Sequence, residues 1–257
     1  MKEFGNRGGS PPSPPAILAR KLRTLARSPR TSVMSKFMPW REKRARAYLK
    51  AAGVCALLRP GNASEFAPEA VDLALLHRTV REHRPARILE FGSGYSTIVM
   101  AHALRMNGGG KLYAVDASEA WLANTAGKLP PELKEHVELT YSPCSVTLFN
   151  GRLCHLFERL PNIAPNLVYV DGPAARDVAG DVHGLAFNGK NEHERRAPVS
   201  ADLLLYESTL PDGCIVVIDT RMTNTSFLLN NLQRRWRHRY DLGNKSHVLT
   251  LRDWPKR

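Results

Sequence analysis

The chain has 257 residues, 43% of them hydrophobic, which is enough for one substantial core. Its net charge of +13 comes almost wholly from residues 1–60, which hold 14 Lys and Arg against 2 acidic residues, whereas residues 61–257 hold 23 against 22. The four scattered cysteines form no CxxC pair, and no apolar run approaches the ~20 residues that cross a bilayer. These features argue against a disulfide framework, a cysteine-based zinc site and a transmembrane protein, and they predict a reducing, cytoplasmic environment.

The N-terminal quarter differs in composition from the rest. Residues 1–15 are rich in Gly, Pro and Ser and are predicted to be a disordered leader. Residues 16–60 are predicted to be a basic helical segment, in which Ala16–Arg27 places a narrow apolar stripe along one helix face. We interpret that helix as packing one edge on the main domain. The alternatives are a membrane-surface or partner-binding helix and an organelle transit peptide.

From residue 68 onward, predicted helices and strands alternate. Strands are predicted at Arg87–Phe91, Lys111–Asp116, Val137–Tyr141, Leu167–Asp171 and Cys214–Asp219. Helices are predicted at Pro68–Glu82, Ser96–Met106, Glu119–Leu129, Val199–Leu210 and Asn224–Trp236. Asn150–Gly151 predicts a tight hairpin over Cys144–Phe157, and residues 239–242 and 247–251 a final antiparallel pair. Apolar strands that alternate with helices indicate an α/β fold with a parallel sheet covered on both faces.

The segment between the first strand and its helix carries the strongest functional pattern. Gly92 and Gly94 allow a tight turn and a close approach of a ligand to the backbone, and the helix start offers free N–H groups. Asp116 ends the next strand, 24 positions beyond Gly92, where a carboxylate can accept hydrogen bonds from a ribose diol. Together these features favour a nucleoside-containing cofactor. A nicotinamide cofactor is disfavoured because its glycine pattern needs glycine where Thr97 stands.

The same segment resembles the first motif of class I S-adenosylmethionine-dependent methyltransferases, in which an acidic residue precedes the first glycine by two positions, as Glu90 does here. The resemblance extends to Asp116, to the Val170–Pro173 element and to the strand that ends at Asp219. Ser96 stands where many members have a further small glycine, and it can cap the helix. The resemblance implies a Rossmann-like, seven-stranded, mostly parallel sheet with helices on both faces and an antiparallel last strand. The methyltransferase domain would then be residues 61–257.

The roles of the family's motif residues are assigned to the matching positions of this sequence. The resemblance implies that the glycine turn surrounds the methionine part of the cofactor, that Asp116 holds the ribose, and that Asp171 lies beside the sulfonium. Residues after the second and third strands would flank the adenine. The predicted cofactor-binding set is Glu90, Gly92, Ser93, Gly94, Asp116, Ala117, Ser118, Ser142 and Asp171.

Methyl transfer to a hydroxyl requires that the acceptor oxygen is aligned with the methyl group and that the hydroxyl loses its proton. The candidate bases are Asp171, His183 and Asp219, and Arg176 and Arg221 are candidates for binding an acidic acceptor. The Asp171 and Asp219 pair resembles catechol-type O-methyltransferases, in which two Asp and an Asn hold Mg²⁺. Here Asp219 is followed by Thr and Arg, so a divalent metal is not favoured and no metal ligand is predicted.

The predicted function is methyl transfer from S-adenosylmethionine to a hydroxyl or carboxyl group of a small molecule or glycan. The carboxylates that end strands four and five also resemble a bacterial group of small-molecule and glycan O-methyltransferases. Two alternatives stay open: an RNA or DNA methyltransferase, because of the basic leader and the charged run 234–239, and an inactive methyltransferase-fold binding protein. We interpret 234–239 as a solvated helix end, where basic side chains suit the helix dipole.

Overall fold

The computed structural model describes residues 29–58, 69–188, 198–219, 222–241 and 246–252, with side chains from residue 39 onward. The chain divides into two units, residues 1–41 and residues 42–257. The fold and the site described below lie in the second unit. The predicted leader 1–15 and the predicted helix Ala16–Arg27 lie outside the described residues. No helix in the described part of the chain is long and apolar enough to span a membrane.

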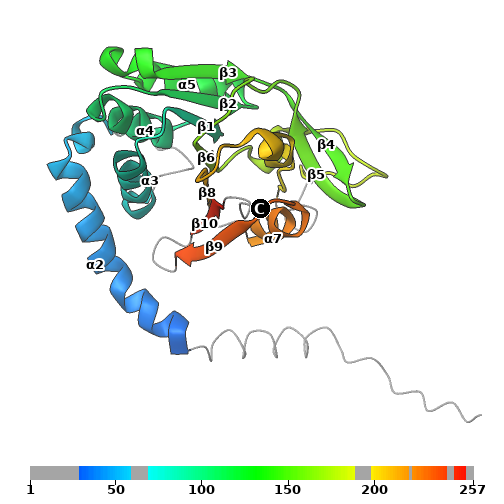
Figure 1. Ribbon diagram of the computed structural model, residues 1–257, viewed down its shortest axis with the longest axis horizontal. Helices are drawn as coiled ribbons and strands as arrows, with labels where there is room; N and C mark the ends of the chain where they lie inside the picture. The colour runs from blue at the N-terminus through cyan, green and yellow to red at the C-terminus, as the bar shows by residue number, and fades with distance from the viewer. Residues whose placement is uncertain (1–28, 59–68, 189–197, 220–221, 242–245, 253–257) are drawn as a thin grey trace, which may run out of the picture. The chain divides into compact units, whose positions relative to one another are not determined.

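A seven-stranded sheet forms the centre of the second unit (Figure 1). Its order is β3-β2-β1-β6-β8-β10-β9, and every neighbouring pair is parallel except those that involve β10. The strands are β1 (Arg87–Phe91), β2 (Lys111–Asp116), β3 (Val137–Tyr141), β6 (Leu167–Val170), β8 (Ile215–Ile218), β9 (Trp236–Asp241) and β10 (Ser246–Leu251). The predicted Rossmann-like fold class is therefore confirmed. The parallel strands bring the ends of β1, β2, β6 and β8 to one edge of the sheet.

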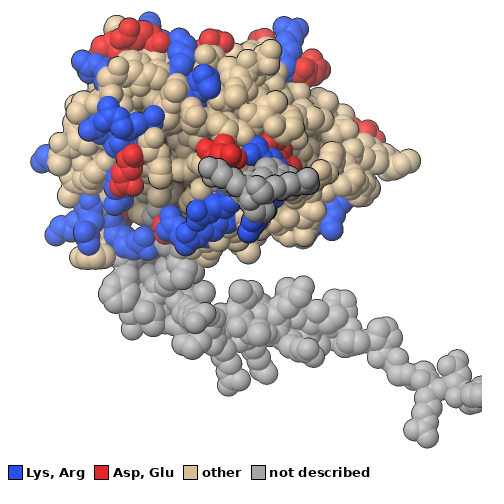
Figure 2. All heavy atoms as spheres, viewed as in Figure 1, with Lys and Arg blue, Asp and Glu red and all other residues tan. Residues whose placement is uncertain are grey.

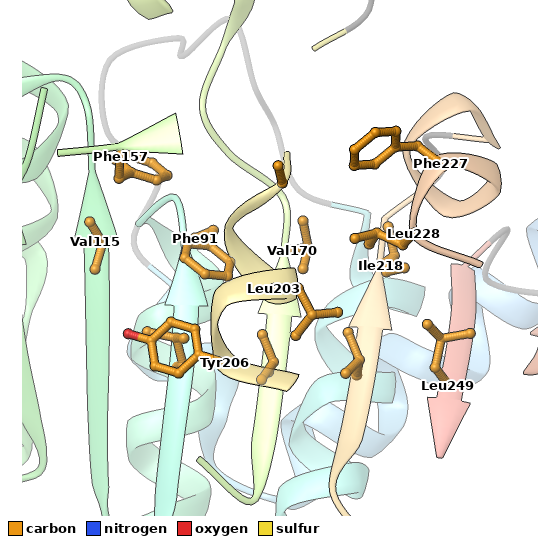
Figure 3. Packing of buried hydrophobic residues seen from close by; sticks show 14 of the residues in the cluster. Phe91, Val115, Phe157, Val170, Leu203, Tyr206, Ile218, Phe227, Leu228 and Leu249 are labelled. Atoms are coloured by element: carbon orange, nitrogen blue, oxygen red, sulfur yellow. The ribbon is translucent and has the colours of Figure 1, made fainter. Parts of the chain in front are cut away.

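Each face of this sheet has its own layer. On one face, α3 (Ala70–His83), α4 (Tyr95–Met106) and the short helix η2 (Pro131–His136) supply apolar side chains to a shared core. On the other face, neighbouring strands contribute Val115, Phe91, Val170, Ile218 and Leu249 side by side (Figure 3). These pack against α6 (Asp202–Tyr206) and α7 (Met222–Asn231). Because both faces are covered, the central strands are apolar on both sides.

A second, three-stranded sheet lies against the α6 and α7 layer. The predicted hairpin is confirmed as β4 (Cys144–Phe149) and β5 (Arg152–Phe157), with the turn at Asn150 and Gly151, both at positive φ. The short strand β7 (Val178–Ala179) pairs with the start of β4. Buried residues of this sheet, Cys144, Cys154 and Phe157, belong to the same core cluster as the sheet strands.

Two helix predictions are wrong in extent. The predicted helix Val199–Leu210 forms only as α6 and the 3₁₀ turn η4 (Glu207–Thr209), because the backbone at residues 199–201 hydrogen-bonds to His155 of β5. The predicted helix Asn224–Trp236 ends at Asn231. The carboxylate of buried Glu207 accepts hydrogen bonds from the backbone N–H groups of Gln233 and Arg234 and from the indole of Trp236, which turns the chain into β9. The run 234–239 is therefore not a helix end.

The N-terminal helix of the described chain, α2 (Pro29–Ala51), lies within the predicted basic segment. Within the second unit, its residues Ala45 and Leu49 are buried in a cluster with residues of α3 and with Val54 of the 3₁₀ turn η1 (Val54–Ala56). The Tyr48 hydroxyl lies 2.8 Å from His77 Nδ1, and His77 Nε2 lies 3.1 Å from Nδ1 of His102 on α4. Burial, aided by the nearby positive charges, lowers the pKa of His77 to about 4.

This histidine pair predicts a loss of stability in acid. Below the ordinary pKa of 6.5 the unfolded chain binds a proton that folded His77 does not, so the free energy of unfolding falls between pH 6.5 and pH 4. We expect His77 to account for about 3 kcal/mol of that fall. Denaturant unfolding across this range should show a shallower pH dependence for His77→Gln than for the wild type. His83→Gln, on an exposed position of the same helix, should leave it unchanged. Equal slopes for His77→Gln and wild type would contradict this assignment.

Candidate cofactor-binding and active site

The turn after β1 is shaped by a close backbone contact. Gly92 has φ +96°, and a Cβ placed on it would lie 3.0 Å from the backbone nitrogen of Gly172. A Cβ on Gly172 would lie 2.6 Å from the Cα of Gly92. The backbone N–H groups of Asp171 and Gly172 both donate to the carbonyl of Phe91, at 3.1 and 2.6 Å. Glycine at both positions therefore lets the loop after β6 close on the turn after β1.

Glu90 lies beneath this turn with no exposed surface. Its carboxylate accepts hydrogen bonds from the hydroxyls of Ser96 and Thr97, and the Thr97 hydroxyl in turn accepts from the backbone N–H of Gly94 at 2.9 Å. Burial raises the pKa of Glu90 to about 8, against the lowering effect of these two hydroxyls. The helix cap is Gly94, so the predicted cap Ser96 bonds to Glu90 instead. Glu90 thus stabilises the turn through its hydrogen bonds with Ser96 and Thr97.

A closed ring of hydrogen bonds connects the turns after β1 and β2. Asp116, only 5% exposed, accepts from the Ser93 hydroxyl at 2.7 Å and from the backbone N–H of Ser118 at 3.0 Å. Ser118 caps α5 (Glu119–Lys128) by accepting from the backbone N–H of Trp121, and the Trp121 indole donates to the Ser93 carbonyl. Burial raises the pKa of Asp116, and hydrogen bonds from Ser93 and Ser118 oppose that effect.

These two turns and the loop after β6 enclose a cavity of about 310 Å³. Its lining residues are Gly92, Ser93, Asp116, Ser118, Ala120, Trp121, Asp171, Gly172, Pro173, Ala174, Arg176 and Asp177. The volume falls within the range of small-molecule and cofactor pockets. The carboxylates of Asp116, Asp171 and Asp177 give the cavity negative charge and hydrogen-bond acceptors at the edge where β1, β2 and β6 end.

The cavity brings together part of the predicted cofactor set. Its lining includes five of those residues, Gly92, Ser93, Asp116, Ser118 and Asp171, as well as the predicted acceptor residue Arg176. The other predicted cofactor residues, Glu90, Gly94, Ala117 and Ser142, do not line it. The hydroxyl of fully buried Ser142 accepts from the backbone N–H of Arg159 at 2.8 Å. The roles assigned to all these residues stay predictions.

The remaining predicted residues lie further along the same edge. Asp219 follows β8 and is half-buried, and its backbone N–H donates to the carbonyl of Val170 at 3.1 Å, beside Asp171. His183 is exposed, at positive φ in the turn between Val182 and Leu185, and does not line the cavity. Arg221 lies outside the described residues. Among the residues that the structure describes, no group of three His, Cys, Asp or Glu could hold a metal ion.

Six lining residues are not among the predicted site residues, and two of them, Trp121 and Asp177, have side chains that can form hydrogen bonds. Trp121 stands three positions after Ser118, and a helix cap at that serine would have placed it in the first turn of α5, facing the glycine turn. Asp177 ends the 3₁₀ turn η3 (Ala175–Asp177), and nothing in the local sequence distinguishes it from a surface acid.

Comparison with known families identifies the chain. A family model described as "Methyltransferase domain" matches residues 89–220, just over half of the 257 residues, and this span contains the whole cavity. The chain belongs to this methyltransferase family. It is a class I S-adenosylmethionine-dependent methyltransferase, and its cofactor is S-adenosylmethionine.

Solved structures resemble this methyltransferase at low sequence identity. The O-methyltransferase TomG from Streptomyces achromogenes, involved in tomaymycin synthesis and crystallised with SAM, has 18% identity and a TM-score of 0.43, covering 82% of this chain and 88% of its own. An O-methyltransferase from Bacillus cereus in complex with SAH has 14% identity and a TM-score of 0.46, covering 81% and 90%. A methyltransferase from Geobacter sulfurreducens has 11% identity and a TM-score of 0.45, covering 92% and 97%. No curated protein matches the chain.

The residues of the cavity fit this cofactor. A side chain at Gly92 or Gly172 would fill space that the two loops share. The buried Asp116 carboxylate can accept from a ribose diol, because Ser93 and Ser118 use only part of its lone pairs. When bound, S-adenosylmethionine supplies an electrophilic methyl group on a sulfonium. The residues that would hold and orient it are those of the turn at Gly92, the carboxylate of Asp116 and the loop that begins at Asp171.

The contact at Gly92 predicts that Gly92→Ala destabilises the fold and abolishes cofactor binding. The new Cβ would approach backbone atoms that cannot move aside and would be strained at φ +96°, at a cost of about 2 kcal/mol or more. Denaturant unfolding and calorimetric titration with S-adenosylhomocysteine measure both effects. Gly127→Ala is the control, because nothing lies within 4 Å of its added Cβ on α5, and it should be neutral or slightly stabilising. Wild-type stability in Gly92→Ala would refute the close-contact argument.

The position of Asp116 predicts that Asp116→Ala weakens cofactor binding by about 1–3 kcal/mol, the cost of leaving the ribose hydroxyls without this acceptor. Ser93 and Ser118 would lose the carboxylate in the free and the bound protein alike, which lowers the stability of the fold. Calorimetric titration with S-adenosylhomocysteine gives the difference. Affinity equal to that of the wild type would show that the ribose binds elsewhere.

Proposed function

We propose that this methyltransferase transfers its methyl group to an oxygen of a small molecule or glycan, with a hydroxyl preferred to a carboxyl group. The observation that supports the proposal is the pair of carboxylates where β6 and β8 end. Asp171 lines the cofactor cavity, and Asp219 follows the adjacent strand, whose last residue Ile218 pairs with Val170. A carboxylate can orient a hydroxyl and accept its proton, whereas it would repel an acceptor carboxylate.

In this proposal Asp171 acts as the base that removes the acceptor proton, and Asp219 orients the acceptor. Arg176, exposed at the cavity rim, contributes a donor for an acidic group elsewhere on the acceptor. Methyl transfer needs close alignment of the two reacting groups, which the loop from Asp171 to Asp177 would supply by lying over the cofactor and beside the acceptor.

The experiment incubates the full chain with isotopically labelled S-adenosylmethionine and a panel of acceptors, namely phenols, neutral glycans, uronic acids, RNA and DNA. We expect labelled hydroxyl-bearing products. Asp171→Asn should lower kcat by about 100-fold or more, as the loss of a positioned base does, while binding of S-adenosylhomocysteine changes little. Asp212→Asn, at the opposite edge of the sheet, is the charge-matched control. Wild-type kcat in Asp171→Asn, or labelling of RNA or DNA alone, would contradict the proposal.

A nucleic acid acceptor is the second candidate, and one observation favours it. The edge strand β9 exposes Arg237 and Arg239, so these basic side chains lie on the surface near the end of the sheet. Against it, acidic and basic side chains are interspersed on the face shown in Figure 2, and residues 61–257 are nearly neutral. A salt-sensitive gel shift with RNA or DNA, lost in an Arg237→Ala, Arg239→Ala double variant, would favour this candidate.

A further inference from the structure

Three carboxylates line the cofactor cavity, those of Asp116, Asp171 and Asp177. Asp116 ends β2, and Asp177 ends η3 on the loop that follows β6. The charge of Asp177 adds to burial in raising the pKa of Asp116. Like charges that line one cavity repel each other, and a ligand that donates hydrogen bonds to both offsets part of that repulsion.

The backbone of Asp177 is held in place by hydrogen bonds and by its buried neighbour. Its backbone N–H donates to the Ala174 carbonyl at 3.0 Å, and the next residue, Val178, is fully buried and pairs with Cys144 of β4. The Asp177 side chain itself is half-buried and makes no hydrogen bond or ion pair within the described part of the chain. Its backbone is therefore fixed by the three-stranded sheet, while its carboxylate has acceptor capacity left for a ligand.

The other polar side chains near Asp116 are already engaged. The Ser93 hydroxyl donates to Asp116, the Ser118 hydroxyl accepts from the Trp121 backbone, and the Trp121 indole donates to a carbonyl. Ser142, the residue after β3 predicted to contact adenine, is fully buried and bonded to the Arg159 backbone. Asp171 also lines the cavity, at the point where its loop contacts Gly92.

Adenosine carries three groups of donors, the two ribose hydroxyls and the exocyclic amine of the adenine. The carboxylate of Asp116 can accept from the ribose, which leaves the amine in need of an acceptor. We propose that Asp177 determines recognition of the adenine: its carboxylate, in the same cavity as Asp116, accepts a hydrogen bond from the exocyclic amine. This inference rests on the cofactor of the family and is independent of the methyl acceptor.

The first test needs only the wild-type chain and two ligands. S-inosylhomocysteine differs from S-adenosylhomocysteine in having a carbonyl oxygen in place of the exocyclic amine, so it would direct an acceptor at the Asp177 carboxylate. We expect calorimetry to show binding at least about tenfold weaker than that of S-adenosylhomocysteine, the size expected when a charged hydrogen-bond acceptor loses its donor. Equal affinity for the two ligands would overturn the proposal, whatever acceptor the enzyme uses.

The second test assigns the preference to Asp177. An Asn at this position can accept from the amine or donate to the carbonyl, so in Asp177→Asn the ratio of the two affinities should fall from about tenfold or more to near unity. Asp181→Asn removes the same charge from the same loop, at an exposed residue outside the cavity that caps Gly184, and should keep the wild-type ratio. Retention of the wild-type ratio in Asp177→Asn, or equal weakening of both ligands, would overturn the assignment.

Discussion

The buried carboxylate of Asp116 joins the two turns that form the cofactor cavity. Through Ser93 it holds the turn after β1, and through Ser118 it holds the start of α5, from which Trp121 returns a hydrogen bond to Ser93. A buried carboxylate is costly without donors, and these donors satisfy only part of its acceptor capacity. The arrangement is therefore stable in the free protein and still able to accept from a ribose.

The contact between Gly92 and Gly172 connects that cavity to the loop after β6, which is proposed to orient the methyl acceptor. It brings the loop after β6 within backbone distance of the turn after β1, so one loop carries Asp171 at its start and Asp177 near its end. Asp171 is thereby placed where β6 ends, beside the strand that leads to Asp219. In the proposed arrangement, cofactor binding and acceptor orientation would both depend on this glycine pair, and a side chain at either position would disturb both.

The sequence correctly predicts the elements whose bounds depend on short-range pattern. The strands Arg87–Phe91, Lys111–Asp116 and Val137–Tyr141 have their predicted bounds. Glycine follows the first strand and precedes the second, and the second ends in an acid, so short-range pattern marks these two. The predictions are wrong where a residue distant in the sequence determines where an element ends. Glu207 ends α7 early by binding the backbone of residues 233 and 234. Asp177 lines the cavity because the strand order brings its loop to the turns after β1 and β2, which no short-range pattern records.

We infer that the glycine turn, Asp116 and the loop after β6 form a site for S-adenosylmethionine and not for a nicotinamide cofactor. Calorimetric titration of the full chain with S-adenosylhomocysteine and with NAD⁺ under the same conditions tests this inference. We expect saturable binding of one S-adenosylhomocysteine per chain and no heat with NAD⁺. Absence of heat with S-adenosylhomocysteine, or saturable binding of NAD⁺, would contradict it.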